Sequence, residues 1–276
     1  MTPRGRPLLV SGDARAAVLG GPGGWASLRE LDVAAIAPAL RTRLAEAWAR
    51  DALFEHASVA SFSRFSLHLL AVAAPPELVD DAHSAARDEI RHARMCFALA
   101  SAYAGEPLGP GPLPLEGDLL GPLDLASIAV ATVREGCVGE TLASLEAATA
   151  HELATVVPVK EALAIITEDE ARHAELAWRF VRWALDEGGP EVRAAVRAAF
   201  ESALAAPRPN DAPVDALDAE LAAHGRLSDA RKQAVLREGL DEVVRPAAEA
   251  LLGALAAIAR AERPVRPAQP GAAERP

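Results

Sequence analysis

The chain contains few of the features that mark secreted, membrane-spanning or nucleic-acid-binding proteins. Its two cysteines, Cys96 and Cys137, provide no disulfide framework, which fits a reducing cytosol and predicts a cytoplasmic protein. No run of about 18 uncharged apolar residues is present, and residues 1–10 include no continuous apolar stretch, so we expect neither a membrane span nor a signal peptide. The net charge of −11 argues against a nucleic-acid partner, which needs a basic face.

Aromatic residues and lysine are also scarce, while alanine, leucine and valine are abundant. Hydrophobic residues make up 51% of the 276 positions, which is enough for a sizeable core. Because alanine and leucine favour helix, the composition predicts an all-α protein. The length exceeds what one helical bundle needs and falls short of two full domains.

One five-residue pattern, Asp-Glu-x-Arg-His, occurs twice, at 88–92 and at 169–173. Its glutamate and histidine are three residues apart, so on a helix they lie on one face, one turn from each other. A single such pair is common on exposed helices, but a second copy indicates a shared site. The two pairs are Glu89 with His92, and Glu170 with His173.

Each copy is preceded by a further glutamate, Glu55 before the first and Glu140 before the second. The separation allows one helix to end and an antiparallel partner to return to the same level. Helical spacing places these glutamates on apolar stripes, where a carboxylate is costly unless it is paired or bound to a metal. Four carboxylates and two imidazoles match the charge and donor preference of two divalent ions, and they suit Fe(II) or Mn(II) better than a structural zinc.

The same spacing predicts four long helices, which cover residues 38–73, 77–104, 123–153 and 159–186. The connection at 105–122 is rich in glycine and proline. Fully extended, it reaches about 60 Å, whereas a helix of 28 residues is about 42 Å long. This segment can therefore cross the whole bundle, which is the connectivity of a ferritin-like four-helix bundle.

Further segments flank the four helices. The expected division of the chain is an N-terminal arm (1–37), the four-helix bundle (38–187), a C-terminal helical extension (188–261) and a disordered tail (262–276). A short helix is expected near 28–36, and the extension is expected to contain helices at 191–206, 214–224 and 228–260. We interpret the last of these as a cap or as the surface of a homodimer.

Glu55 and Glu140, each followed by Asp-Glu-x-Arg-His, resemble the pattern of carboxylate-bridged di-iron proteins of the ferritin-like superfamily. The doubled pattern is similar to that of bacterial di-iron monooxygenases, and the resemblance covers about residues 40–187. It implies activation of O₂ or peroxide at two iron ions, with manganese as the alternative metal. The implied ligands are Glu55, Glu89, His92, Glu140, Glu170 and His173.

Four neighbours of these residues are candidates for supporting roles. We expect Asp88 and Asp169, which directly precede ligand glutamates, to accept hydrogen bonds from the ligand histidines of the partner helix. Related oxygenases often carry a hydroxyl residue one turn after the glutamate of the third helix. Ser144 occupies that place here and Thr141 is adjacent to Glu140, so both are candidate catalytic residues.

Other polar and aromatic residues nearby have structural interpretations. Glu135 is expected on the surface, because it is five residues from Glu140 and points to another face. His56 follows Glu55 directly and is expected to point sideways, away from any ligand role. Core packing is the default expectation for both cysteines and for Trp178 and Trp183.

The leading hypothesis is an O₂-dependent oxidase or hydroxylase acting on a small organic substrate. The sequence has no flavin or Fe–S motif, so the hypothesis implies an external electron donor or reductase. The alternatives are a ferritin-like iron-binding protein with ferroxidase or peroxide-scavenging activity, and a metal-binding scaffold without catalysis. An apolar pocket beside the metals favours the first, and an acidic entry path favours the second. The only tyrosine, Tyr103, is three turns beyond His92, which argues against ribonucleotide reductase activity, and the absence of a Cys₄ motif excludes a full rubrerythrin.

Overall fold

The computed structural model describes residues 6–21, 23–26, 31–207, 212–213 and 215–261. Within these residues the chain is mostly helical, as its composition predicts. The long helices are α1 (Pro38–Ala71), α2 (Pro76–Ala104) and α5 (Val157–Glu187), and the third helical rod consists of α3 (Leu125–Thr132), the π-helix η1 (Val133–Glu140) and α4 (Thr141–Leu153). The C-terminal region contains α6 (Pro190–Ala205), α7 (Asp218–Ala223), α8 (Asp229–Glu238), the π-helix η2 (Gly239–Val244) and α9 (Arg245–Ala261).

Proline and glycine set the ends of several helices. Pro76 starts α2, where its missing N–H and fixed φ are tolerated. Gly105 ends the same helix with φ at 81°, a left-handed conformation that suits glycine, and its N–H donates to the Ser101 carbonyl. At the start of α3 the Asp124 side chain accepts a hydrogen bond from the Ser127 N–H, at 2.9 Å.

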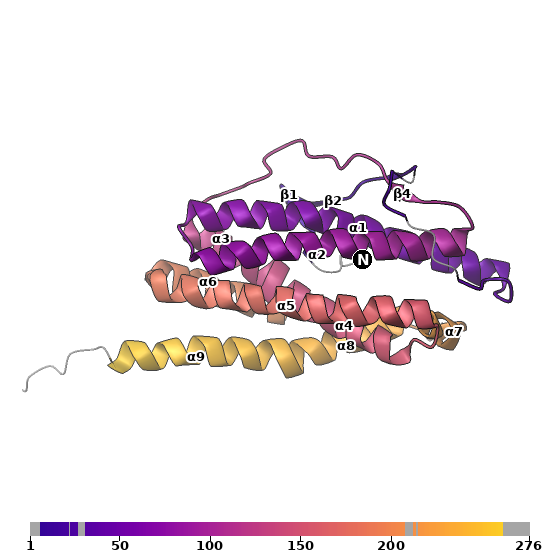
Figure 1. Ribbon diagram of the computed structural model, residues 1–276. Helices are drawn as coiled ribbons and strands as arrows, with labels where there is room; N and C mark the ends of the chain where they lie inside the picture. The colour runs from indigo at the N-terminus through magenta and orange to yellow at the C-terminus, as the bar shows by residue number, and fades with distance from the viewer. Residues whose placement is uncertain (1–5, 22, 27–30, 208–211, 214, 262–276) are drawn as a thin grey trace, which may run out of the picture.

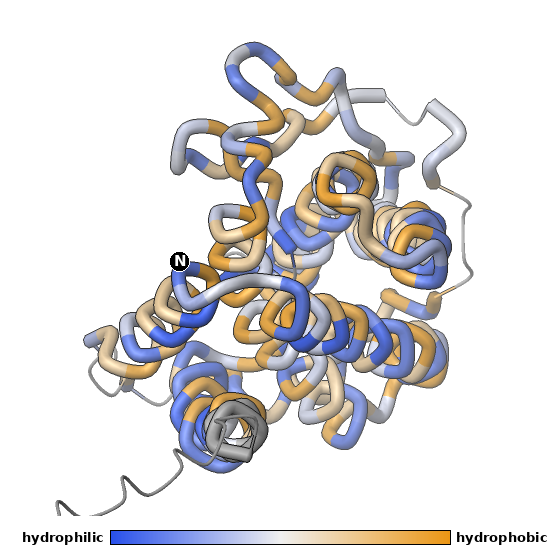
Figure 2. Tube along the Cα trace, turned by 90° about the vertical axis from the view of Figure 1, so that its left-hand side faces the viewer, coloured by the Kyte–Doolittle hydropathy of each residue, from blue (hydrophilic) through white to orange (hydrophobic). Residues whose placement is uncertain are grey.

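The bundle consists of two packed layers. Helices α1 and α2 form one layer, and α5 with the α3–η1–α4 rod forms the other, with α9 beneath it (Figure 1). The connection from α2 to α3 runs along the outer side of the α1–α2 layer from one end to the other (Figure 1). Viewed along their axes, the helices carry hydrophobic residues on one side and hydrophilic residues on the other (Figure 2).

A polar layer divides the hydrophobic core into two clusters. One cluster includes Trp48, Phe97 and Leu163, and the other includes Phe62 and Phe180. On each of the four rods, the residues of the doubled pattern and the glutamates that precede it lie between the segments that form the two clusters. The apolar packing on both sides therefore holds the polar layer at one level of the bundle.

The N-terminal arm packs against the α1–α2 layer. Strands β1 (Leu8–Val10) and β2 (Asp13–Arg15) form an antiparallel hairpin, and Leu8 and Val10 pack on Ala57 of α1. Strand β3 (Leu19–Gly20) pairs with β4 (Gly109–Pro110), which joins the arm to the long connection.

Three expectations about local structure are wrong. The helix expected over 123–153 is not a continuous α-helix, because η1 interrupts it, and η2 likewise interrupts the helix expected over 228–260. Of the short helix expected near 28–36, residues 31–36 contain no helix, with a turn at 34–35, and 27–30 lie outside the described residues. The expected disordered tail, 262–276, also lies outside the part of the chain that the structure describes.

Among the described residues, no helix is both long enough and apolar enough to cross a membrane.

Candidate metal centre

The structure gathers the four glutamates and histidines of the doubled pattern, together with Glu55 and Glu140, in the polar layer of the bundle. Each of two groups has ligand atoms within 4.8 Å of one another, so the layer could hold a metal ion. Five of the six side chains are buried, and Glu55 keeps the largest exposure, 13%. The groups are Glu55, Glu89, His92 and Glu170, and Glu140, Glu170 and His173.

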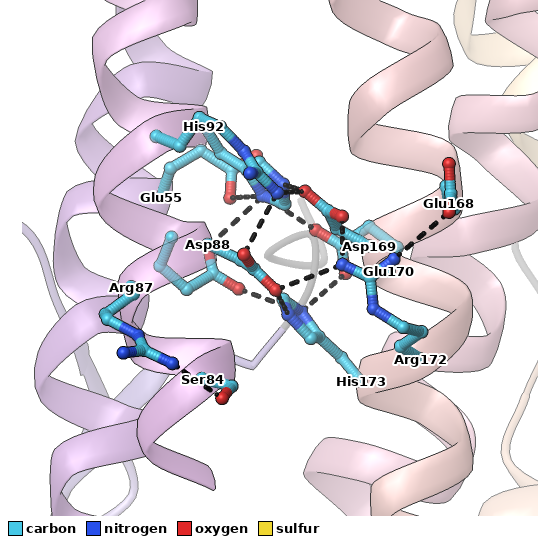
Figure 3. A network of polar contacts seen from close by, with 12 residues as sticks. Glu55, Ser84, Arg87, Asp88, His92, Glu168, Asp169, Glu170, Arg172 and His173 are labelled. Atoms are coloured by element: carbon cyan, nitrogen blue, oxygen red, sulfur yellow. Dashed lines mark hydrogen bonds and ion pairs between the residues drawn. The ribbon is translucent and has the colours of Figure 1, made fainter. Parts of the chain in front are cut away.

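The two copies of the pattern face each other from α2 and α5 (Figure 3). On each helix the glutamate and histidine project from adjacent turns toward the partner helix, as their spacing of three requires. Glu55 comes from the middle of α1, and Glu140 is the last residue of η1. Each of the four rods therefore contributes to the cluster.

Glu89 lies between the two imidazole rings. Its Oε2 is 3.7 Å from Nδ1 of His92, and its Oε1 is 3.2 Å from Nδ1 of His173. Glu170 has the same relationship, with Oε1 at 3.6 Å from Nδ1 of His92 and Oε2 at 3.7 Å from Nδ1 of His173. Both carboxylates thus present one oxygen to each ring, and Glu55 adds a third oxygen at 3.9 Å from Nδ1 of His92.

The other ring nitrogen of each histidine faces an aspartate of the opposite helix. His92 Nε2 is 2.9 Å from Oδ2 of Asp169, and His173 Nε2 is 3.5 Å from Oδ2 of Asp88. A hydrogen on Nε2 that is donated to the aspartate leaves the Nδ1 lone pair free toward the cluster. Asp169 therefore accepts the hydrogen bond expected from His92, whereas Asp88 lies beside His173 without forming one.

Arg91 and Arg172 link both aspartates at the edge of the bundle. Arg91 donates to Asp88 at 2.9 Å and also contacts Asp169. Arg172 contacts Asp169 and donates to Asp88 at 3.3 Å. Because each arginine bridges two aspartates that come from different helices, the four side chains form a closed ring of ion pairs outside the histidines.

The charges of the cluster shift the pKa values of its members in opposite directions. Burial and the neighbouring carboxylates hold the pKa of Glu55 and of Glu140 well above the usual range. Burial also opposes ionisation of Glu89, but the two imidazoles outweigh it and lower the pKa of Glu89. Burial alone lowers the pKa of His92, yet Asp169, Glu89 and Glu170 outweigh it and raise that pKa to about 9. Without a cation, the cluster therefore holds protons in place of positive metal charge.

Many polar atoms of the cluster lack hydrogen-bond partners. The described residues contain twelve buried side-chain nitrogen and oxygen atoms without such a partner. Seven of them belong to this cluster: Oε2 of Glu89, Nδ1 of His92, both oxygens of Glu140, Oε2 of Glu170, and both ring nitrogens of His173. Buried unsatisfied atoms are rare in proteins, and their concentration here fits a site built to coordinate metal ions.

A small cavity touches the cluster beside Glu55 and Glu170. It has a volume of about 20 Å³, which is enough for about one water-sized molecule. Its other lining residues are Trp48, Asp51, Cys96, Ala143, Ala147, Leu163 and Ile166. Asp51 forms an ion pair with Arg226, whose guanidinium lies 4.7 Å from the Trp48 ring.

The two candidate hydroxyl residues occupy different environments. Thr141 is buried and accepts a hydrogen bond from Trp178 Nε1 at 3.2 Å. Ser144 is half-buried on α4 and is not among the residues that line the small cavity, whereas Ala143 and Ala147 are. Neither hydroxyl belongs to the two groups of clustered ligand atoms.

Glu135, expected on the surface, is instead buried with 9% exposure. It lies between two arginines, with Oε2 at 3.6 Å from Arg6 Nε and 3.1 Å from Arg64 Nη2. The Arg6 guanidinium also stacks at 3.9 Å from the centroid of the Phe65 ring. Regular α-helical spacing fails here because Glu135 lies in η1, and no pattern in the sequence assigns Arg6 to the core.

The remaining expectations about neighbouring residues concern packing. Cys96 and Cys137 are buried, and burial raises the pKa of the Cys137 thiol. Trp178 stacks on Phe200, with ring centroids 5.4 Å apart, and Trp183 packs on Phe180. Core packing is therefore confirmed for these four side chains.

Comparison with known proteins identifies no relative. No protein-family model, no curated protein and no solved structure matches the chain.

Proposed function

We propose that this chain is a non-haem di-iron oxidoreductase of ferritin-like architecture, which activates O₂ to oxidise a small organic molecule. The observation that carries the proposal is the position of Glu89 and Glu170, each with one oxygen toward the Nδ1 atom of each histidine. Two ligand atoms at ~2.1 Å from one metal ion, at about a right angle, are about 3 Å apart. The separations of 3.2–3.7 Å in the structure approach this value on both sides of each carboxylate.

The donor set supports two similar metal ions. Glu55, Glu89, His92 and Glu170 would hold one metal ion, and Glu140, Glu170 and His173 would hold the other. Oxygen-rich ligation with one imidazole per metal favours iron or manganese over a structural zinc. Two irons in such a set would supply the electrons that reduce O₂.

The protein residues prepare the site in three ways. Asp169 orients the His92 imidazole by accepting from Nε2, and Asp88 lies 3.5 Å from Nε2 of His173, so that Nδ1 of each ring points inward. The apolar clusters on both sides exclude bulk water from the carboxylates, which strengthens their attraction to cations. Burial and neighbouring carboxylates raise the pKa of Glu55 and of Glu140, so both would have to give up protons to hold a cation.

Electrons for repeated turnover come from an external donor or reductase under this proposal. The small cavity beside Glu55 and Glu170 is lined mainly by apolar side chains, and its one further carboxylate, Asp51, is paired with Arg226. This lining suits O₂ and an apolar substrate. It is less suited to an entry path for Fe(II), which needs acidic side chains. Its volume of about 20 Å³ means that an organic substrate enters only when the side chains around it move.

The same small volume favours a second candidate. An iron-binding protein with ferroxidase or peroxide-scavenging activity needs space only for a water-sized oxidant beside the metals. The two candidates differ in their behaviour with excess Fe(II). A ferroxidase oxidises many equivalents of Fe(II) and an oxygenase stops after the bound pair.

The test is anaerobic titration with Fe(II) followed by mixing with O₂. We expect two Fe(II) bound per chain, oxidation of both on mixing, and a change in visible absorbance that the apoprotein lacks. Glu170→Ala should lose stoichiometric binding of two irons. The exposed Glu168→Ala, two residues away on the same helix, is the matched control and should bind both. Tight binding of two irons by Glu170→Ala would show that the ligand set is wrong.

A further inference from the structure

A second and much larger cavity lies outside the metal centre. It has a volume of about 810 Å³ and is bounded by the outer side of α1, the N-terminal arm and the long connection between α2 and α3. Figure 1 shows this connection passing along the α1–α2 layer on the side away from α5. Cavities of about 300–1,000 Å³ hold drug-sized ligands.

The walls of the cavity are predominantly aliphatic. Four of its large apolar side chains are exposed by more than a third: Leu67 at 52%, Leu115 at 47%, Ile90 at 39% and Leu120 at 37%. They come from α1, α2 and the long connection, which are distant in sequence, yet they border one space. Apolar surface gathered in a concave site marks a place where a hydrophobic ligand is bound.

The cavity extends along about three turns of α1. The residues of this helix that line it extend from His56 to Leu67. At 1.5 Å per residue this stretch is about 16 Å long. A flexible aliphatic chain fits a space of this shape better than a compact, multiply charged metabolite does.

The polar groups of the wall indicate an uncharged ligand. Among the described residues that line the cavity, Arg64 is the only ionic side chain apart from the titratable His56, and its guanidinium already donates to the Leu9 carbonyl and to Glu135. His56 has a buried Nδ1 without a hydrogen-bond partner, and its ring packs edge-on to Trp25 at 4.9 Å. One hydrogen-bonding group on the ligand would satisfy this nitrogen.

We propose that this cavity binds an uncharged, elongated aliphatic molecule with a single polar group, such as a medium-chain alcohol, with the polar group at His56. The site is distinct from the metal centre, because α1 and α2 separate the two. His56 directly follows Glu55 and Ile90 directly follows Glu89, so the ligand lies behind the turns that carry two metal ligands. The proposal does not depend on the di-iron function, since no metal ligand lines this cavity.

Binding is tested with N-phenyl-1-naphthylamine, an uncharged fluorescent probe, on the full chain with and without metal. We expect saturable fluorescence enhancement at one probe per chain, and displacement by 1-dodecanol. Dodecanoate should displace the probe about tenfold less well, because the described wall residues offer its carboxylate no cation that is not already paired. Equal displacement by both ligands would overturn the assignment of an uncharged ligand, and non-saturable binding would overturn the site.

Two pairs of variants locate the probe. Ser63→Trp places a large side chain in the cavity, whereas Leu70→Trp changes an exposed position of α1 that does not line it. Leu120→Arg adds a charge to the wall, whereas Leu123→Arg adds one to an exposed position outside it. We expect the first member of each pair to weaken probe binding about tenfold and the second to leave it unchanged. If folded Ser63→Trp or folded Leu120→Arg bound the probe as tightly as the unchanged chain, the probe would bind elsewhere.

Discussion

Asp169 on α5 accepts a hydrogen bond from Nε2 of His92 on α2, at 2.9 Å, and so one copy of the repeated pattern orients the histidine of the other. The reciprocal contact between Asp88 and His173 is longer, at 3.5 Å. This exchange explains why both copies carry an aspartate immediately before the glutamate. Neighbouring residues on a helix point in different directions, so the glutamate faces the cluster while the aspartate faces the edge of the partner helix.

The first prediction concerns these aspartates. Asp169→Asn should weaken binding of Co(II), used as a spectroscopic substitute for iron, by about 10–100-fold, because the imidazole loses its oriented acceptor. Asp88→Asn should have a smaller effect, since its contact is longer. Binding is measured by absorbance titration, with Glu168→Gln as the control on the same helix. If Asp169→Asn changed the Co(II) affinity no more than the control did, Asp169 would not orient His92.

The second prediction concerns the pH dependence of the apoprotein. Burial and Glu170 raise the pKa of Glu140 in the folded state, so the folded chain binds this proton more tightly than the unfolded chain does. The contribution of Glu140 to folding stability is fully present below its pKa in the unfolded chain. It is lost as the pH rises through its pKa in the folded chain. Glu140→Gln, which removes the charge, should therefore stabilise the apoprotein at pH 7 by more than about 1 kcal/mol.

The check is chemical denaturation of the chelator-treated protein at pH 4 and pH 7. The advantage of Glu140→Gln over the natural chain should be small at pH 4 and large at pH 7. The exposed Glu168→Gln should change stability little at either pH. Destabilisation by Glu140→Gln at pH 7 would show that the carboxylate is ionised and paired in the apoprotein.

The sequence predicts the all-helical fold and the close grouping of the six candidate ligands because both depend on regular spacing. Glu89, His92, Glu170 and His173 repeat at an interval that any α-helix converts into one face. The structure departs from the expectation where the helix is not regular. In η1 the wider turn changes the direction of each side chain, and Glu135 consequently lies in the core rather than at the surface.

The two cavities and the burial of Arg6 could not be predicted from the sequence, for a different reason. They depend on contacts between segments far apart along the chain, such as Arg6 with Glu135 and Leu8 with the long connection. Periodicity describes one element at a time and contains no information on which segments meet. The arm and the connection also have no regular period, so their packing against α1 was not predictable from hydrophobic spacing.

The third prediction concerns the packing of η1 against α5. A Cβ atom added at Gly136 would lie 2.4 Å from the Cβ of Ala177, which is closer than packed atoms approach. Gly136→Ala should therefore destabilise the protein by about 1–3 kcal/mol despite the higher helix propensity of alanine. Urea denaturation measures the change, and Ala177→Gly in the same chain should recover part of the loss.

Gly253 provides the control for this pair. No atom lies within 4 Å of a Cβ added there, and the residue is exposed on α9. Gly253→Ala should be neutral or stabilise by about 0.5–1 kcal/mol, because it removes only the entropy cost of glycine. If Gly136→Ala behaves like Gly253→Ala, then η1 and α5 do not pack as closely as the structure indicates.

The fourth prediction concerns Arg6, whose charge is buried beside Glu135 and the Phe65 ring. Burial lowers the pKa of Arg6, and Glu135 and Glu140 oppose this effect. Arg6→Met keeps much of the apolar contact but removes the charge, and Arg64 remains as a partner for Glu135. We expect a loss of about 2–3 kcal/mol in the free energy of unfolding, below the usual cost of leaving a buried charge without any partner.

A double variant separates the ion pair from general packing. Glu135→Gln combined with Arg6→Met should lose less stability than the sum of the two single changes, because the double variant removes both charges of the pair and each single variant leaves one of them behind. Arg182→Ala, which breaks an exposed pair with Asp186 on α5, should cost less than about 1 kcal/mol. Strict additivity in the double variant would mean that Arg6 stabilises the arm through its contacts with Phe62 and Phe65 rather than through Glu135. Weaker Co(II) binding by Arg6→Met would further indicate that the arm also maintains the position of Glu140 at the end of η1.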